Sequence, residues 1–225
     1  MMKKELRLVV LGGPGSGKGT QGQIISSLLG LKHLSTGEYF RDHIQRGTEL
    51  GILAQRYIGR GMLVPDEVAS RLLRDILQHL PPAEGFILDG YPRSLPQARD
   101  LAELLQKGEK KLDAVFYLKV SDEEIVRRLE GRLVCRNCQK SFHIKFQPPA
   151  NKGICDHCGG PLFRRDDDNP ATIRQRLLVF HEMTEPLIAF YNESGLLREI
   201  DAEGLPADVK KKVESAAQSL APIGR

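Results

Sequence analysis

A glycine-rich loop that carries a single lysine is the segment of this sequence whose chemistry is easiest to infer. An apolar run at residues 8–11 is typical of a buried parallel strand, and it leads directly into the sequence GGPGSGKGT at residues 12–20. The glycines allow successive backbone N–H groups to point inward, and the helix expected next aims its positive end at the same place. Lys18 adds a mobile charge for phosphate oxygens. The predicted phosphate-binding residues are Gly13, Pro14, Gly15, Ser16, Gly17, Lys18, Gly19 and Thr20.

The loop departs at one position from the general P-loop pattern. Gly19 follows Lys18 where most such loops have serine or threonine, and the hydroxyl comes one residue later, at Thr20. In this respect the loop resembles that of the nucleoside monophosphate kinases, in which Mg²⁺ is held largely through water and substrate phosphates. The resemblance implies that a strict hydroxyl ligand is less needed here.

Four cysteines occur as two C-x2-C pairs, and the linker between the pairs has the length expected of a zinc site. Disulfides are disfavoured in a reducing cytoplasm, whereas two such pairs can present four thiolates to Zn²⁺ in a tetrahedron. A closed shell of four thiolates leaves no position for water, so we expect a structural ion; the alternative is unligated or disulfide-bonded cysteines. His143 and His157 lie nearby in the sequence, but the four thiolates already complete the shell. The predicted metal ligands are Cys135, Cys138, Cys155 and Cys158.

Length and composition favour one ordinary α/β domain with small insertions. The chain has 225 residues, of which 28% are charged and 40% hydrophobic, and no apolar run approaches the ~20 residues that span a bilayer. The apolar run after Met1-Met2-Lys3-Lys4 is too short for a signal peptide, so we expect a cytoplasmic protein without a membrane partner. The net charge of +4 suits small polyanions at least as well as nucleic acid.

The elements that must position these residues alternate between strands and helices. Residues 17–29 are predicted to form the first helix, and buried strands are predicted at 85–89, 114–118 and 197–201. This alternation predicts an α/β fold in which helices cover both faces of a mainly parallel sheet.

Two helix starts can be recognised by their capping residues. Ser121 and Glu124 form a capping-box pattern, and Asn169 with Pro170 begins a long amphipathic helix. Ile173, Leu177 and Phe180 recur on one face of that second helix and are predicted to lie in the core.

Two segments interrupt the alternation and are predicted to be insertions. They are a helical segment at 35–64 and the cysteine-bearing segment at 131–168, and the core domain then comprises 1–34, 65–130 and 169–225. The cysteine-bearing segment is poor in aliphatic runs, so a metal ion is expected to supply its cross-link.

Several motifs occur in the order found in the adenylate kinases. They are the P-loop, STGEYFR at 35–41, LVPDE at 63–67, LDGYPR at 88–93 and RDDD at 165–168. The chain therefore resembles a long-form adenylate kinase of the metal-bearing subgroup, from residue 6 to residue 201. The resemblance implies reversible, Mg²⁺-dependent transfer of the γ-phosphoryl group of ATP to AMP, giving two ADP. It also implies that the first insertion binds AMP and that the second is a lid with a zinc ribbon over ATP.

The resemblance also implies roles for individual residues. Catalysis falls to Lys18, Arg93, Arg132, Arg165 and Arg176, and ATP binding to the loop residues with Arg128 and Arg132. AMP binding falls to Thr36, Arg41, Val64, Gly90, Arg93, Gln97, Arg165 and Arg176, with Thr36 and Gln97 at the adenine. Asp89 is expected to orient waters on Mg²⁺ and Asp167 to support the lid arginines, whereas Arg127, Asp166 and Asp168 are expected to be solvated. Arginine suits these roles because its planar fork grips phosphate oxygens in pairs.

Two positions depart from the family pattern. Leu133 stands where a second arginine is common, and Gln139 stands where a glycine commonly follows the second cysteine. A left-handed backbone at Gln139 would cost about 1 kcal/mol.

Two other functions are compatible with parts of the sequence. One is another monophosphate kinase, with a pyrimidine or guanine acceptor. The other is a zinc-ribbon protein that binds nucleic acid, although aromatic residues make up only 6% of the chain and the basic residues do not form one stripe. We expect ATP, AMP and ADP as the partners, no nucleic acid, and a monomer, because no long apolar stripe requires a second copy.

Overall fold

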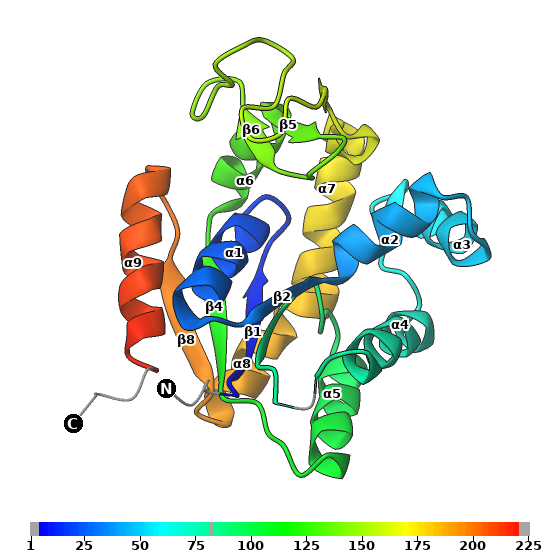
Figure 1. Ribbon diagram of the computed structural model, residues 1–225, viewed down its shortest axis with the longest axis vertical. Coiled ribbons are helices and arrows are strands. Elements are labelled where there is room, and N and C mark those ends of the chain that lie inside the picture. Colours follow the sequence, from blue (N-terminus) through cyan, green and yellow to red (C-terminus); the bar gives the residue numbers. More distant parts are fainter. Residues whose placement is uncertain (1–4, 82, 221–225) are drawn as a thin grey trace.

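A five-stranded parallel sheet forms the centre of the molecule in the computed structural model, which describes residues 5–81 and 83–220 (Figure 1). The strand order is β2-β3-β1-β4-β8, and every neighbouring pair is parallel. The strands are β1 (Arg7–Gly12), β2 (Lys32–Ser35), β3 (Phe86–Asp89), β4 (Ala114–Lys119) and β8 (Leu197–Asp201).

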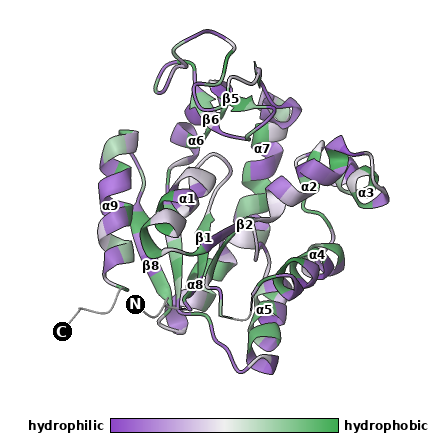
Figure 2. Ribbon diagram, in the orientation of Figure 1, coloured by the Kyte–Doolittle hydropathy of each residue, from purple (hydrophilic) through white to green (hydrophobic). Residues whose placement is uncertain are grey.

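The central strands are buried on both faces, which explains their continuous apolar sequences. In β1, Val9 and Leu11 belong to one hydrophobic cluster, and Leu8 and Val10 belong to the cluster on the opposite face. Because successive side chains of a strand alternate, a strand covered on both sides must be apolar throughout. Figure 2 shows these strands in hydrophobic colours while the outer faces of the helices are polar.

Helices cover both faces of the sheet, so the predicted fold class is confirmed. On one face α1 (Lys18–Leu29) packs against α9 (Pro206–Gln218) and contributes Ile25 to the shared cluster. On the other face lie α4 (Asp66–Gln78), α5 (Leu95–Lys107) and α8 (Pro186–Glu193).

The predicted strands and helix starts are confirmed, and one strand of the main sheet was missed. Ser121 and Asn169 both cap their helices, because their side chains accept hydrogen bonds from the N–H groups of Glu124 and Thr172. The long helix predicted from Asn169 is divided into α7 (Pro170–Val179), a π-helical turn η2 (Phe180–Thr184) and α8. β2 was not predicted because its four residues include a lysine and a histidine and form no apolar run.

Two short segments lie at the margins of the sheet. Helices α2 (Thr36–Gln45) and α3 (Glu49–Ile58) pack on each other and stand away from it at one side (Figure 1). A second, antiparallel sheet of β5 (Arg132–Cys135), β6 (Ser141–His143) and β7 (Leu162–Phe163) lies at the top of Figure 1, in the order β6-β5-β7. It is connected to the main sheet by α6 (Asp122–Glu130) and, through the 3-10 turn η1 (Asp166–Asp168), by α7.

The small sheet has little apolar material of its own. Its buried cluster contains only Cys135, Phe142 and Cys155, with three partly buried neighbours. Burial of so little apolar surface does not offset the entropy of ordering about 40 residues, so a further cross-link is required.

None of the helices within 5–81 and 83–220 has both the length and the apolar character that a membrane span needs.

We predict that His181, in the π-helical turn η2, stabilises the protein to a degree that depends on pH. Its two ring nitrogens contact Glu185 at 2.9 Å and Asp122 at 3.0 Å, and these hydrogen bonds raise the pKa of the imidazole. A group whose pKa is raised on folding stabilises the protein below its unfolded pKa of about 6.5, and this stabilisation is lost as pH rises through the folded pKa. Thermal unfolding should therefore show that His181→Gln destabilises the protein more at about pH 6 than at about pH 8.5.

His79→Gln is the matched control. The His79 side chain is 78% exposed and its nearest carboxylate, on Asp75, is 3.9 Å away. Equal pH dependence of the two variants would contradict the prediction.

Candidate active site

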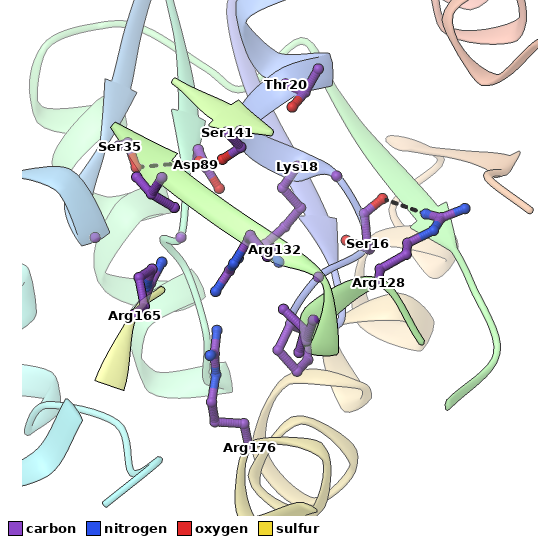
Figure 3. A pocket seen from close by; sticks show the side chains of 18 of the residues that line it. Ser16, Lys18, Thr20, Ser35, Asp89, Arg128, Arg132, Ser141, Arg165 and Arg176 are labelled. Atoms are coloured by element: carbon purple, nitrogen blue, oxygen red, sulfur yellow. Dashed lines mark hydrogen bonds between the residues drawn. The ribbon is translucent and has the colours of Figure 1, made fainter. Parts of the chain in front are cut away.

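A cavity of about 530 Å³ opens above the carboxyl ends of β1 and β3 (Figure 3). In open parallel sheets this edge is where ligands collect. The main sheet contributes the glycine-rich loop, α2 contributes one wall, and the small sheet contributes the opposite wall. Apart from Gly13, every nucleotide-binding residue predicted above lines this cavity: Pro14, Gly15, Ser16, Gly17, Lys18, Gly19, Thr20, Thr36, Arg41, Val64, Asp89, Gly90, Arg93, Gln97, Arg128, Arg132, Arg165, Asp167 and Arg176.

The backbone of the loop adopts the conformations that its glycines permit. Gly15 and Gly17 have φ values of 77° and 94°, which side-chain-bearing residues rarely adopt. A Cβ atom on Gly15 would lie 2.7 Å from the Leu129 side chain. The Ser16 hydroxyl is buried without a hydrogen-bond partner in the described part of the chain, so it is available to a ligand. Gly13 does not line the cavity, and it packs against Ile125 instead.

Lys18 lies at the base of the cavity. Its Nζ donates to the carbonyl oxygens of Gly12 and Gly13, at 2.8 and 2.7 Å. Burial lowers the pKa of the ammonium group to about 7, and the neighbouring Arg93 and Arg176 contribute in the same direction. The surroundings of Lys18 therefore contain too little negative charge to balance its ammonium group.

Five arginines converge on the same cavity from separate parts of the chain. We call Arg41, Arg93, Arg132, Arg165 and Arg176 the arginine cluster. Burial, and then repulsion by Arg165, lower the pKa of Arg41 to about 9. Burial also lowers the pKa of Arg176 to about 10, with Arg132 and Arg165 acting in the same sense. In Figure 3 the Arg132 and Arg176 guanidinium groups extend toward the space beside Lys18. Such concentrated positive charge favours a polyanion.

Asp167 is the carboxylate that orders two of these arginines. It accepts hydrogen bonds from Arg165 at 2.5 and 2.8 Å and from Arg176 at 3.0 Å. Burial opposes its ionisation, but the charges of Arg165 and Arg176 outweigh burial and lower the pKa of Asp167 to about 2. The carboxylate therefore remains charged and holds both guanidinium groups in place.

The prediction that Asp168 is solvated was wrong. Its side chain is 0% exposed, and it accepts from Arg132 at 2.5 and 2.8 Å and from Arg176 at 3.2 Å. The turn η1 directs Asp167 and Asp168 inward while Asp166 stays exposed, as predicted. A run of three identical residues offers no sequence signal for which of them face inward.

Asp89 ends β3 beside the loop. Its carboxylate accepts a hydrogen bond from Ser35 at 3.2 Å (Figure 3), and a Cβ on Gly19 would lie 3.4 Å from its Oδ2. His33 was missed by sequence reasoning: its Nε2 is buried 3.9 Å from the same oxygen. It lies in the unpredicted strand β2, so no sequence signal indicated it.

Polar groups also mark the wall formed by α2 and the start of α5. Thr36 Oγ1 donates to the carbonyl oxygen of Asp89 at 3.4 Å. Gln97 accepts from the Arg93 backbone N–H at 2.8 Å and donates to Asp66 at 2.7 Å. Gly90 has a φ of 82°, and a Cβ there would lie 2.9 Å from Thr36 Oγ1. Only glycine fits between these groups.

Arg128 is held at the opposite end of the cavity. Its guanidinium donates to Glu124 at 2.7 Å, to the Ala202 carbonyl at 2.8 Å and to the Ser16 carbonyl at 3.5 Å. Arg127, as predicted, is exposed. The cavity is also lined by Glu124 of the capping box and by residues that belong to no motif recognised in the sequence, namely Phe142, His143, Phe146, Gly204, Leu205, Pro206 and Val209.

The four cysteines of the small sheet come together at its edge, outside the cavity. Their Sγ atoms all lie within 4.8 Å of one another, with Cys135 3.5 Å from Cys158 and Cys138 3.6 Å from Cys155. The edge of a tetrahedron with Zn–S bonds of about 2.3 Å is about 3.8 Å, so the arrangement fits a zinc ion. These separations are too long for disulfide bonds.

Neither nearby histidine belongs to the cysteine group. His143 accepts hydrogen bonds from backbone N–H groups of the loop that follows it, and His157 is exposed. Gln139 has a φ of 57°, which is the left-handed backbone considered above.

The sequence is similar over nearly its whole length to those of proteins named adenylate kinase. A family model described as Adenylate kinase matches residues 10–196. An adenylate kinase of Methanothrix thermoacetophila is 46% identical over 199 residues, which are 88% of this chain and 92% of that protein. Adenylate kinases of Streptomyces avermitilis and Caldicellulosiruptor saccharolyticus are 44% and 42% identical, each over 94% of this chain and 96% and 98% of their own lengths.

The parallel sheet, the glycine-rich loop at its edge and the convergent cations define a P-loop phosphotransferase. Within that class the similarity to adenylate kinases extends over nearly the whole chain, including residues 35–64 and 131–168. The chain belongs to the adenylate kinase family.

We predict that Asp168→Asn lowers the free energy of unfolding by about 2–3 kcal/mol, the range expected when hydrogen bonds to charged groups are lost. The reason is that Arg132 and Arg176 would keep their buried charges without this carboxylate. Denaturant unfolding measures the change. Asp166→Asn, in the same turn but exposed, should leave stability within about 0.5 kcal/mol of the parent. Similar losses in both variants would refute the assignment.

Proposed function

We propose that Lys18 and the arginine cluster align ATP and AMP end to end and stabilise the γ-phosphoryl group during its transfer. The observation that carries this proposal is that these cations, from separate parts of the chain, line one cavity. An AMP phosphate oxygen forms the new bond to the γ-phosphorus while the bond to the β,γ-bridging oxygen breaks, and both products are ADP. The acceptor phosphate, with a second pKa of about 6, is already mostly a dianion at neutral pH, so no general base is required.

The chain is proposed to work as a core with two moving segments. The core comprises 1–34, 65–130 and 169–225, the AMP-binding segment 35–64, and the lid 131–168. Support comes from where the cations originate: Arg41 lies on α2, Arg132 on β5 and Arg165 before η1. Closure of the two segments over the loop would exclude water, which would otherwise accept the phosphoryl group.

The roles proposed for individual side chains are those that the family resemblance implies, and the lining of the cavity supports them. The loop residues and Lys18 would bind the ATP phosphates, with Arg128 at the ATP end. Arg41 and Arg93 would bind the AMP phosphate, and Arg132, Arg165 and Arg176 would surround the transferring group. Thr36 and Gln97 would contact the AMP base, Val64 and Gly90 would complete the AMP site, and Asp167 would hold the lid arginines.

Two metal ions fit the residues present. Asp89 offers a carboxylate beside the loop, which suits orientation of water on Mg²⁺. When bound with ATP, Mg²⁺ supplies charge neutralisation at the phosphates. The four cysteines would hold a structural zinc ion that replaces the missing apolar core of the lid.

The remaining proposals concern the acceptor base, the oligomeric state and the cellular location. Adenine is proposed as the acceptor base, and a kinase for other monophosphates or a nucleic-acid-binding protein is not favoured by the family comparison. A monomer is proposed because the lid needs free space to move, and a cytoplasmic location is proposed because four free thiols suit a reducing compartment.

Adenylate kinase activity predicts one outcome from a panel of acceptors. Purified protein with Mg²⁺ and ATP should convert AMP rapidly to ADP, and GMP, CMP and UMP at less than about a tenth of that rate, because polar pockets discriminate strongly between bases. Chromatographic separation of the nucleotides measures each product. Preferred use of another acceptor would leave the phosphate roles standing and reject adenine; no transfer to any acceptor would reject the function.

We predict that Cys135→Ala separates stability from catalysis. Loss of one thiolate should reduce the bound zinc and lower the melting temperature by several degrees, because the lid loses its cross-link. Turnover at moderate temperature should fall less, since the cysteines do not line the cavity. Metal analysis and thermal unfolding test the prediction. Unchanged zinc content and melting temperature would show that the cysteines hold no structural ion.

A further inference from the structure

Asp66, the first residue of α4, holds the side-chain amide of Gln97 from behind the cavity. Its Oδ1 accepts from Gln97 Nε2 at 2.7 Å, and its Oδ2 accepts from Ser94 Oγ at 2.8 Å. On its other side the amide accepts, through Oε1, the backbone N–H of Arg93 at 2.8 Å. Gln97 is 2% exposed and lines the cavity, whereas Asp66 does not line it.

The chemistry of these two neighbours permits only one orientation of the amide. An ionised carboxylate only accepts hydrogen bonds, and a backbone N–H only donates. If the amide were reversed, its oxygen would face the Asp66 carboxylate and its NH₂ group would face the Arg93 N–H. Two mismatched polar contacts in a buried place would be strongly unfavourable. The orientation of Gln97 is therefore fixed by its partners.

The orientation decides which base edge the amide can match. After its protein contacts, Gln97 retains one lone pair on Oε1 and one hydrogen on Nε2. Adenine presents an amino donor at position 6 and an acceptor at N1. Hypoxanthine and guanine present a carbonyl acceptor at position 6 and an N–H donor at N1. A fixed amide that pairs with the adenine edge meets the reversed pattern in the 6-oxopurines.

We propose that Asp66 is a specificity-determining positioning residue: by fixing the amide of Gln97, it makes the acceptor site prefer a 6-aminopurine over a 6-oxopurine monophosphate. The proposal rests on the base contact assigned to Gln97 above. Asp66 acts only through Gln97 and does not touch the substrate.

Asp66→Asn tests this role because it keeps the shape and replaces one acceptor oxygen by a donor. The side-chain amide introduced by this substitution can pair with either orientation of Gln97, so only the Arg93 backbone N–H still opposes the reversed orientation, which becomes more accessible. The measurement is kcat/KM for AMP and for IMP, which carries the 6-oxo edge without the extra amino group of GMP. The ratio of the two values should fall by about tenfold, within the range that a bidentate base contact contributes. The value of kcat/KM should decrease with AMP and increase with IMP.

Asp75→Asn is the matched control on the same helix. The Asp75 side chain is 69% exposed and lies far along α4, so this variant should keep the parent ratio within about twofold. Thermal unfolding establishes that each variant is folded. If Asp66→Asn does not fold, Asp66→Ala carries the same prediction, because it removes the carboxylate that opposes reversal of the Gln97 amide.

The outcomes separate this inference from the proposed function. A parent enzyme that makes no ADP from AMP rejects the function itself. A parent that uses AMP, together with an Asp66→Asn variant that keeps the AMP-to-IMP ratio, rejects only the role of Asp66. Equal loss of activity with both acceptors also rejects it, because a purely structural residue would act in that way.

Discussion

Lys18 and the arginine cluster repel one another across a buried cavity, and the rest of the structure serves as the framework that holds them together. Their lowered pKa values express this repulsion, since burial and neighbouring cations both act against the charged form. Asp89, Asp167 and Asp168 offset part of it. Phosphate groups would supply the negative charge that the cavity otherwise lacks, so the site favours a polyanion.

The two sheets of this framework are stabilised in different ways, one by apolar packing and the other by a group of four cysteines. The sheet is fixed by apolar packing on both faces, so the loop after β1 and the carboxylate of Asp89 have well-defined positions. The small sheet that carries Arg132 has almost no apolar core, and its four thiols are arranged for a metal ion instead. Apolar packing thus positions the main sheet, whereas the small sheet has four thiols arranged for a metal ion in place of an apolar core.

Around Gln97, the side chains are ordered by the direction of their hydrogen bonds rather than by the attraction of opposite charges. Gln97 lies between a group that only accepts and a group that only donates, so its amide has a defined direction. An amide can distinguish one base edge from another only if its direction is fixed. The same carboxylate also holds Ser94, which caps α5, so the start of that helix and the amide are ordered together.

The sequence by itself determined the elements whose signals are local. Buried strands carry continuous apolar runs, Ser121 and Asn169 cap their helices with short-range hydrogen bonds, and the loop GGPGSGKGT requires a phosphate-sized backbone cradle. The spacing of the two C-x2-C pairs also predicted that the four cysteines come together. Tertiary structure alone decided what depends on contacts between distant residues: that Asp168 faces inward while Asp166 does not, that β2 joins the sheet despite its polar residues, and that Asp66 holds Gln97. These outcomes depend on which partner each side chain meets across the fold, and no local pattern encodes the partner.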